Sequence, residues 1–279
     1  MQLKASITIF FLPLLLLPAL SGCSAVRNIN FYSTSQEIQL GQSLDKEIHK
    51  QFQILPDARV DTFLALRGRK LVEASDRKDL AYHFFLVNSE EINAFAIPGG
   101  FCYVNLGLFR QSDTENELIS VLAHEINHVV HRHSMKRLSQ MQIVDAGTQA
   151  LIGNANSMTG TVTNLFTSIG LLNFSREDER EADRDGLLTM YRAGYDPHGM
   201  VEMFEMLKKG RETGEPGRWE KLFSTHPITD ERIRNASQLI AQLPPIEGMI
   251  VDSPEWKGTI EYLREKYPPP KKEDKEDKK

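Results

Sequence analysis

The sequence is poor in cysteine and has no excess of positive charge. Only Cys23 and Cys102 occur among its 279 residues, so the fold must be stabilised by its apolar core and not by a disulfide framework. The formal net charge of −5 argues against a nucleic-acid-binding protein, which would favour a basic surface. A chain of this length with 41% hydrophobic residues is able to bury a sizeable core.

Long hydrophobic runs are scarce too. Residues 7–20 form such a run, but Pro13 and Pro18 interrupt it, and it is too short for a good membrane span. Lys4 precedes the run and small residues follow it, which is the pattern of a secretory signal peptide. We therefore expect residues 1–22 to be a signal peptide.

Leu20, Ser21 and Gly22 precede Cys23, and the tetrapeptide Leu-Ser-Gly-Cys resembles the lipobox of bacterial lipoproteins. The resemblance implies that Cys23 carries lipid and begins the mature protein, with residues 23–34 as a tether. Ser24 follows the cysteine, which in this class favours the outer membrane. A periplasmic protein that is anchored to a membrane without spanning it is therefore expected. Cys102 then has no disulfide partner, and we expect it to be a small buried apolar residue.

Apolar residues recur with helical periodicity along much of the chain. The periodicity predicts helices over residues 35–54, 57–74, 114–133, 175–193, 197–209 and 230–243. Residues 82–87 read as a buried strand. Two β-prone runs flank a Pro-Gly-Gly sequence at 98–100, which predicts a hairpin or a bent strand within residues 93–105.

Two segments give less regular signals. Residues 141–173 are rich in small and polar residues and predict broken helix. The charged, proline-containing segment 266–279 is expected to be disordered. These bounds leave one folded domain over residues 35–265, without internal repeats.

His124, Glu125 and His128 form a His-Glu-x-x-His motif within a predicted helix. Residues four apart lie on one face of a helix, so both imidazoles are able to reach one metal ion. Glu125 is then able to accept a proton from the water that a zinc ion activates. The motif follows an apolar stretch, and polar groups on a buried helix need partners, which one zinc ion per chain provides.

Catalytic zinc usually has a third protein ligand. The template with a third histidine requires glycine at 131 and histidine at 134, and the chain has neither. We therefore expect His131 and His133 to be surface or local packing residues.

A carboxylate from a second helix is the alternative third ligand. Glu179 and Asp183 are four residues apart and share a helix face. Glu179 is able to bind the metal while Asp183 accepts the free N–H of a ligating histidine, which fixes the orientation of that ring. Glu181 is expected to point elsewhere and to be solvated.

With these motifs, the chain resembles the zinc metallopeptidase family that includes HtpX, the CAAX prenyl endopeptidases and the periplasmic proteins BepA and LoiP. The matching segments are residues 93–100, 124–134, 175–183, 193–197 and 224–233. The resemblance implies that Glu179 is the third zinc ligand. It also implies an α+β fold: a mostly helical, zincin-like (gluzincin) metallopeptidase domain with a small sheet beside the active-site helix.

The resemblance assigns roles to further residues. An edge strand that binds extended substrate by β-augmentation is implied for Asn93, Ala94, Phe95 and Ala96. His226 is implied to approach the zinc ion and block the water position, with Arg232 nearby. Two alternatives stay open: His226 or Arg232 stabilises the oxyanion, or His226 is an ordinary loop residue.

The implied function is hydrolysis of internal peptide bonds in unfolded or misassembled envelope proteins, as part of envelope protein quality control. The alternative is a non-catalytic lipoprotein that holds client proteins and whose zinc is structural. Glu125 argues against this alternative, because a structural site has no use for a carboxylate beside the metal. After residue 23 the sequence offers no membrane span and no room for a repeat array, so we expect it to be most similar to the single-domain lipoproteins of the family.

Overall fold

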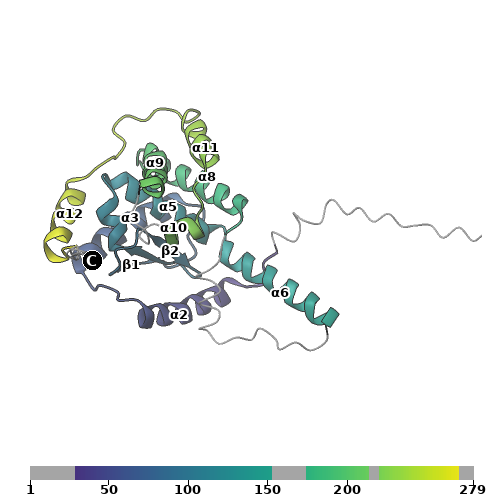
Figure 1. The fold of residues 1–279 in the computed structure, drawn as a ribbon. Coiled ribbons are helices and arrows are strands. Elements are labelled where there is room, and N and C mark those ends of the chain that lie inside the picture. Colours follow the sequence, from purple (N-terminus) through teal and green to yellow (C-terminus); the bar gives the residue numbers. More distant parts are fainter. Residues whose placement is uncertain (1–28, 153–173, 214–219, 270–279) are drawn as a thin grey trace, which may run out of the picture.

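The computed structural model describes residues 29–152, 174–213 and 220–269, most of which are helical. The helices are, in chain order, α2 (Thr34–Gln51), α3 (Ala58–Ala74), α4 (Leu106–Gln111), α5 (Glu115–Val130), α6 (His133–Ile152), α8 (Arg176–Arg192), α9 (His198–Thr213), α10 (Glu220–Thr225), α11 (Asp230–Ile240) and α12 (Pro254–Lys266). The strands are β1 (His83–Val87), β2 (Ala94–Ile97) and β3 (Phe101–Asn105). This arrangement confirms the α+β class, with a small sheet among many helices (Figure 1).

The sheet has three strands, with β3 between β1 and β2. β1 runs parallel to β3, whereas β2 pairs antiparallel with β3 along its whole length. Gly99 and Gly100 form the turn between β2 and β3 with φ angles of 84° and 91°, a conformation that favours glycine. The predicted hairpin is therefore confirmed, and it leaves β2 at an edge of the sheet, in contact with α5.

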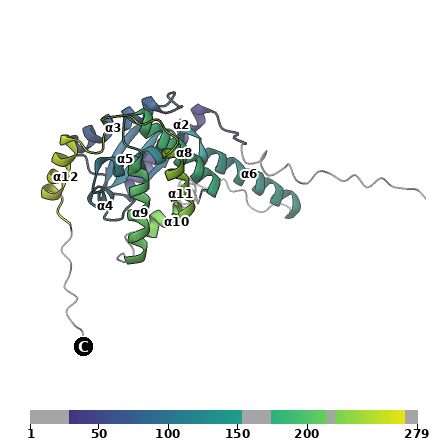
Figure 2. The same cartoon turned by 90° about the horizontal axis from the view of Figure 1, so that it is seen from above.

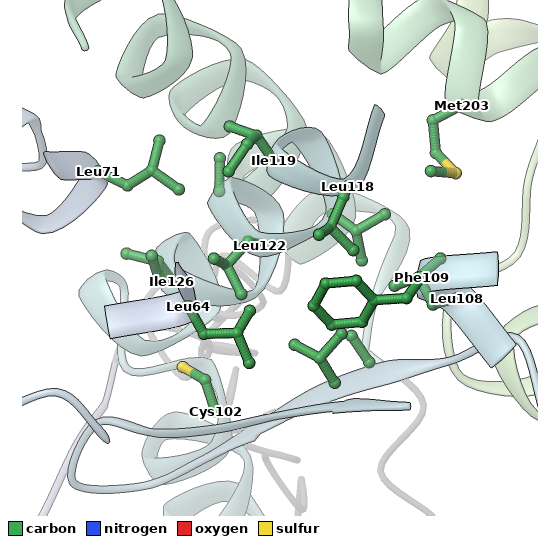
Figure 3. Packing of buried hydrophobic residues seen from close by; sticks show 14 of the residues in the cluster. Leu64, Leu71, Cys102, Leu108, Phe109, Leu118, Ile119, Leu122, Ile126 and Met203 are labelled. Atoms are coloured by element: carbon green, nitrogen blue, oxygen red, sulfur yellow. The ribbon is translucent and has the colours of Figure 1, made fainter. Parts of the chain in front are cut away.

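Helix α5, which carries the His-Glu-x-x-His motif, lies at the centre of the fold. The carboxylate of Glu117 accepts a hydrogen bond from the Thr114 amide and caps the N-terminus of the helix, and every residue from 115 to 129 is buried. Figure 3 shows part of the core around it, with Leu64, Leu71, Cys102, Leu108, Phe109, Leu118, Ile119, Leu122, Ile126 and Met203. Burial of one such large apolar side chain contributes about 1.5–3 kcal/mol, so the motif helix is firmly held. Cys102 is buried there, as predicted.

Helix α5 ends at Val130, three residues before the predicted end. Arg132 has a φ of 56°, and this left-handed backbone conformation terminates the helix. The Nε atom of Arg132 lies 2.8 Å from Glu37 Oε2, and Nη2 lies 2.7 Å from the carbonyl oxygen of Tyr32. These contacts hold the turn in place. Helix α6 begins directly after it and projects away from the other helices in both views (Figures 1 and 2).

Helix α8 lies against α5. Ser175 caps its N-terminus, because the Ser175 hydroxyl accepts a hydrogen bond from the Asp178 amide at 3.2 Å. Gly186 permits a close approach of the two helices, since a Cβ atom at this position would lie 3.3 Å from the backbone of His124. The helix predicted over 175–193 is confirmed, and its acidic face meets the motif helix.

The other predicted helices form as α2, α3, α9 and α11. The predicted strand forms as β1, but only Leu86 and Val87 of its five residues are buried. Helices α4, α10 and α12 were not predicted from the sequence. In α12 the indole of Trp256 packs against Phe63, with ring centroids 6.0 Å apart. The buried residues of α12 are Trp256, Thr259 and Leu263. Three positions are too few to give a clear periodic signal.

Several predictions concern residues outside the described ranges. These residues are the signal peptide over 1–22, Cys23, the tether as far as residue 28, residues 153–173 of the predicted broken helix, and residues 270–279 of the predicted tail. Residues 141–152 of the predicted broken helix form continuous helix as part of α6, and the rest of that segment lies outside the described residues. Among the described residues, no helix is both long and apolar enough to cross a membrane.

Candidate metal centre

Two histidine rings of α5 face each other inside the protein. His124 and His128 are buried, and their Nε2 atoms lie 2.9 Å apart. The planes of the two rings meet at 74°. Burial and the neighbouring histidines hold the pKa of His128 well below its usual value. The ring of His128 is therefore neutral and has a lone pair for a metal ion.

Glu179 reaches the same point from α8. Its Oε2 lies 3.5 Å from His124 Nε2, and its Oε1 lies 3.5 Å from His128 Nε2. Burial alone would raise the pKa of Glu179, but His226, His124 and Arg232 lower it, so the carboxylate is charged. Together with the fourth donor, His226, these buried side chains each offer one atom within 4.8 Å of the others.

The donor set fits a zinc ion. Tetrahedral zinc with bonds of about 2.0–2.1 Å keeps its ligand atoms about 3.3 Å apart. The separations among His124, His128 and Glu179 are 2.9, 3.5 and 3.5 Å. Imidazole nitrogen and carboxylate oxygen are also the donors that zinc takes in catalytic sites. Two buried ring nitrogens so close together need a cation or a proton between them.

Asp183 and Arg232 support the cluster from behind. Asp183 Oδ1 lies 2.9 Å from His124 Nδ1, the ring nitrogen that does not face the cluster. Arg232 binds Asp183 through Nε and Nη2, at 2.7 and 2.6 Å, and its Nη1 lies 2.9 Å from Glu179 Oε2. Burial would raise the pKa of Asp183, but Arg232 and His124 lower it to about 2. Because all three nitrogens of Arg232 are engaged, its geometry favours a supporting role over the oxyanion role that the sequence left open.

Arg232→Ala should destabilise the protein strongly. The substitution leaves the buried carboxylate of Asp183 without its guanidinium partner, and breaking a buried ion pair costs about 3–5 kcal/mol. Urea denaturation measures the free energy of unfolding. The control is Arg234→Ala on the exposed side of the same helix, which should change that free energy by less than about 0.5 kcal/mol. A loss below about 1 kcal/mol in Arg232→Ala, the size typical of exposed pairs, would contradict this role.

Glu125 lies between the donor cluster and the sheet. Its Oε2 accepts a hydrogen bond of 3.0 Å from the backbone N–H of Ala96 in β2, and its Oε1 lies 3.4 Å from His226 Nε2. Burial raises the pKa of Glu125, against the opposing effect of His226 and His124. A carboxyl group with a raised pKa beside a metal centre is suited to accept and return a proton.

Strand β2 is the segment that the sequence analysis predicts to bind substrate. Asn93 and Ala94 are buried, whereas Phe95 and Ala96 are partly exposed. Phe95 stacks on Tyr103 of β3, with ring centroids 4.8 Å apart. The amide of Ala96 points away from β3 and contacts the motif glutamate. Within the part of the chain that the structure describes, no strand pairs with this side of β2, which runs alongside the donor cluster.

His226 follows α10 directly and is buried. Its Nδ1 lies 2.9 Å from Glu179 Oε1 and 3.3 Å from His124 Nε2. Burial opposes a charge on this ring, but Glu179 and Glu125 raise the pKa of His226 to about 9. The ring lies among the donors and against Glu125, which speaks against an ordinary loop histidine.

Two residues that contact His128 were not predicted from the sequence to belong to the site. His133 is buried, and its Nδ1 lies 2.9 Å from His128 Nδ1. Phe174 stacks on the ring of His128, with centroids 4.1 Å apart. Glu181, expected to be solvated, lies 3.1 Å from His133 Nε2. Burial lowers the pKa of His133 to about 4, so this ring is neutral.

A second group of metal-binding side chains lies nearby and is partly exposed. His131, Glu181 and Asp185 offer donor atoms within 4.8 Å of one another. Asp185 pairs with Arg184 at 2.7 Å and with His131 at 2.8 Å. Asp185 thus already has a guanidinium partner, whereas the donors of the other cluster are all buried, which makes the buried cluster the better candidate for a metal ion.

A mostly helical domain with a small sheet, in which two histidines of one helix face a glutamate of another, defines a zincin-like metallopeptidase fold. Residues 59–240 match the sequence model of peptidase family M48. The matched segment is more than half of the chain, and the chain therefore belongs to peptidase family M48. The family indicated by the sequence motifs is thereby confirmed.

Several curated relatives are named as proteases. The beta-barrel assembly-enhancing protease of Escherichia coli (strain K12) is 32% identical over 234 residues, which cover 80% of this chain and 47% of that protein. The mitochondrial metalloendopeptidase OMA1 of Schizosaccharomyces pombe is 29% identical over 77% of this chain and 64% of its own. The metalloprotease LoiP of Escherichia coli (strain K12) is 33% identical over 53% of this chain and 58% of its own. The chain spans about half the length of the first of these relatives.

Proposed function

We propose that the chain is a zinc-dependent endopeptidase that hydrolyses internal peptide bonds of unfolded or misassembled cell-envelope proteins. The observation that carries this proposal is the position of Glu125. Its carboxylate adjoins the donor cluster and accepts a hydrogen bond from the backbone N–H of Ala96 in the edge strand. A purely structural metal site has no use for such a carboxylate. The name of the beta-barrel assembly-enhancing protease supports a role of this chain in envelope protein quality control.

His124, His128 and Glu179 would hold one zinc ion per chain. When bound, zinc supplies a Lewis acid that polarises the scissile carbonyl and increases the acidity of water. Glu125 takes the proton from the attacking water and delivers it to the amide nitrogen as the C–N bond breaks, so the carboxylate ends unchanged. An extended substrate would pair with the open edge of β2, which brings its backbone alongside Glu125.

Digestion of casein by the purified full-length chain tests the proposed function. Casein is unfolded and offers many internal peptide bonds. We expect cleavage that a chelator abolishes and added zinc restores. Casein that binds to the protein and stays intact in the presence of zinc would contradict the proposal and support the client-binding lipoprotein.

His226→Ala should raise the rate of casein cleavage. In the structure the ring contacts both Glu179 and Glu125, so it occupies space that the attacking water and the substrate carbonyl need. The control is His198→Ala, which removes an exposed histidine of α9 and should cleave like the wild type. A rate that falls by about 10²-fold or more would instead make His226 an oxyanion donor. An unchanged rate would remove both roles.

We also propose that the mature protein is periplasmic and is attached by a lipid on Cys23, with the outer membrane as its location. Mass spectrometry of the mature N-terminus should find an acylated Cys23, and the protein should fractionate with membranes. Cys23→Ser should remain unprocessed or appear in the soluble fraction. A native, unacylated N-terminus at another residue would contradict the lipid anchor.

A further inference from the structure

The ring nitrogen of His128 that faces away from the metal cluster contacts a second histidine. We propose that His133 and Glu181 are positioning residues for zinc: Glu181 holds His133, and His133 holds the ligating ring of His128. This inference rests on the proposed zinc site. It adds two residues to that site, and they touch neither the metal nor the substrate.

The side chains of His128, His133 and Glu181 contact one another in series, from the donor cluster to the surface of α8. His128 Nδ1 lies 2.9 Å from His133 Nδ1, and His133 Nε2 lies 3.1 Å from Glu181 Oε2. The side chain of His133 has 0% exposure, whereas that of Glu181 is 32% exposed. Water therefore has no access with which to replace the contacts of the buried ring.

The chain of contacts also fixes which nitrogen of each ring carries the proton. A carboxylate only accepts, so His133 donates from Nε2 to Glu181, and in this tautomer its lone pair lies on Nδ1. His128 then donates from Nδ1 to His133. The remaining lone pair of His128 lies on Nε2, the atom that faces His124 and Glu179. The preferred tautomer of His128 is thus the one that binds zinc through Nε2.

Both ligating histidines are supported in this way, but by different groups. His124 Nδ1 faces the carboxylate of Asp183 directly, at 2.9 Å. His128 reaches its carboxylate through the imidazole of His133. The left-handed turn at Arg132 makes this possible, because it ends α5 and lets the following histidine fold back onto the ring of His128.

The zinc affinity of the full-length protein, measured by competition with a chromophoric chelator, tests the proposal. We expect His133→Leu to weaken zinc binding by about 10–100-fold, the usual effect of removing a partner of a metal ligand. His133→Asn retains a side-chain oxygen that is able to accept from His128 Nδ1, so it should recover part of the lost affinity. Glu181→Ala should weaken binding by a smaller factor than His133→Leu, because the imidazole stays in place.

His131→Ala is the matched control. His131 contacts Asp185 and Glu181 and stacks on the ring of His133, but it does not contact His128, so its removal should weaken zinc binding far less than His133→Leu does. Thermal unfolding with and without zinc separates positioning from a general structural role: zinc should raise the melting temperature of His133→Leu by less than it raises that of the wild type.

Three results would overturn the proposal. The first is wild-type zinc affinity in His133→Leu. The second is an equal loss of affinity in His131→Ala, which would trace the effect to the exposed group of side chains. The third is a zinc-induced rise in melting temperature that is as large in His133→Leu as in the wild type. Failure of the proposed function is distinguishable from all three, because it is read from casein cleavage and not from zinc affinity.

Discussion

Glu125→Gln should bind zinc like the wild type and lose nearly all proteolysis. The amide has the size of the carboxylate and retains an oxygen that is able to accept the hydrogen bond from Ala96, so β2 stays in place. It is unable to accept the proton of the attacking water, and general-base catalysis typically contributes about 10²–10⁴-fold to the rate. Casein cleavage, measured on samples of known zinc content, reports the loss.

The matched control is Glu202→Gln, which makes the same chemical change at an exposed position of α9. It should cleave casein at the wild-type rate. Wild-type cleavage by Glu125→Gln would mean that the general base is a different residue. Zinc loss in Glu125→Gln would mean that this carboxylate supports the metal and not the proton transfer.

Glu179→Ala should lose zinc and, with it, proteolysis. The substitution removes one of three proposed ligands and leaves the two histidines of α5. Loss of a residue that merely supports a ligand weakens metal binding by about 10–100-fold, so loss of a ligand itself should exceed about 100-fold. Elemental analysis of the purified protein and chelator competition measure the effect.

Two further observations make the result on Glu179→Ala decisive. Arg232 keeps both of its bonds to Asp183, so the variant should remain folded, and a thermal melting curve checks this. Glu177→Ala, at an exposed position in the first turn of the same helix, should retain its zinc. Unchanged zinc content in a folded Glu179→Ala would assign the third ligand elsewhere.

Local sequence patterns predicted the elements whose boundaries depend on local chemistry. The hairpin follows from Gly99 and Gly100, which adopt positive φ angles in its turn. Helix α8 follows from its Ser175 cap and its periodic buried face. The end of α5 was mispredicted, because Arg132 is held by Glu37 and Tyr32, about a hundred residues away along the chain. A local pattern contains no information about such a contact.

In the candidate site, too, local sequence patterns predicted some residues and missed one whose position depends on a distant contact. The motif spacing places His124 and His128 on one helix face, and the structure brings the predicted carboxylates of α8 to them. His133 was predicted to be only a surface or local packing residue, because a straight helix that continues past His128 carries it away from the cluster. The turn at Arg132 breaks that helix and returns His133 to the ring of His128, and no spacing rule along a continuous helix predicts this.

Anomalous diffraction at the zinc absorption edge, from crystals of the full-length chain, would show whether His124, His128 and Glu179 hold a zinc ion. We expect one peak between α5 and α8, about 2.0–2.2 Å from Nε2 of His124, Nε2 of His128 and the carboxylate of Glu179. The absence of a peak at this position, or a dominant peak among His131, Glu181 and Asp185, would contradict it.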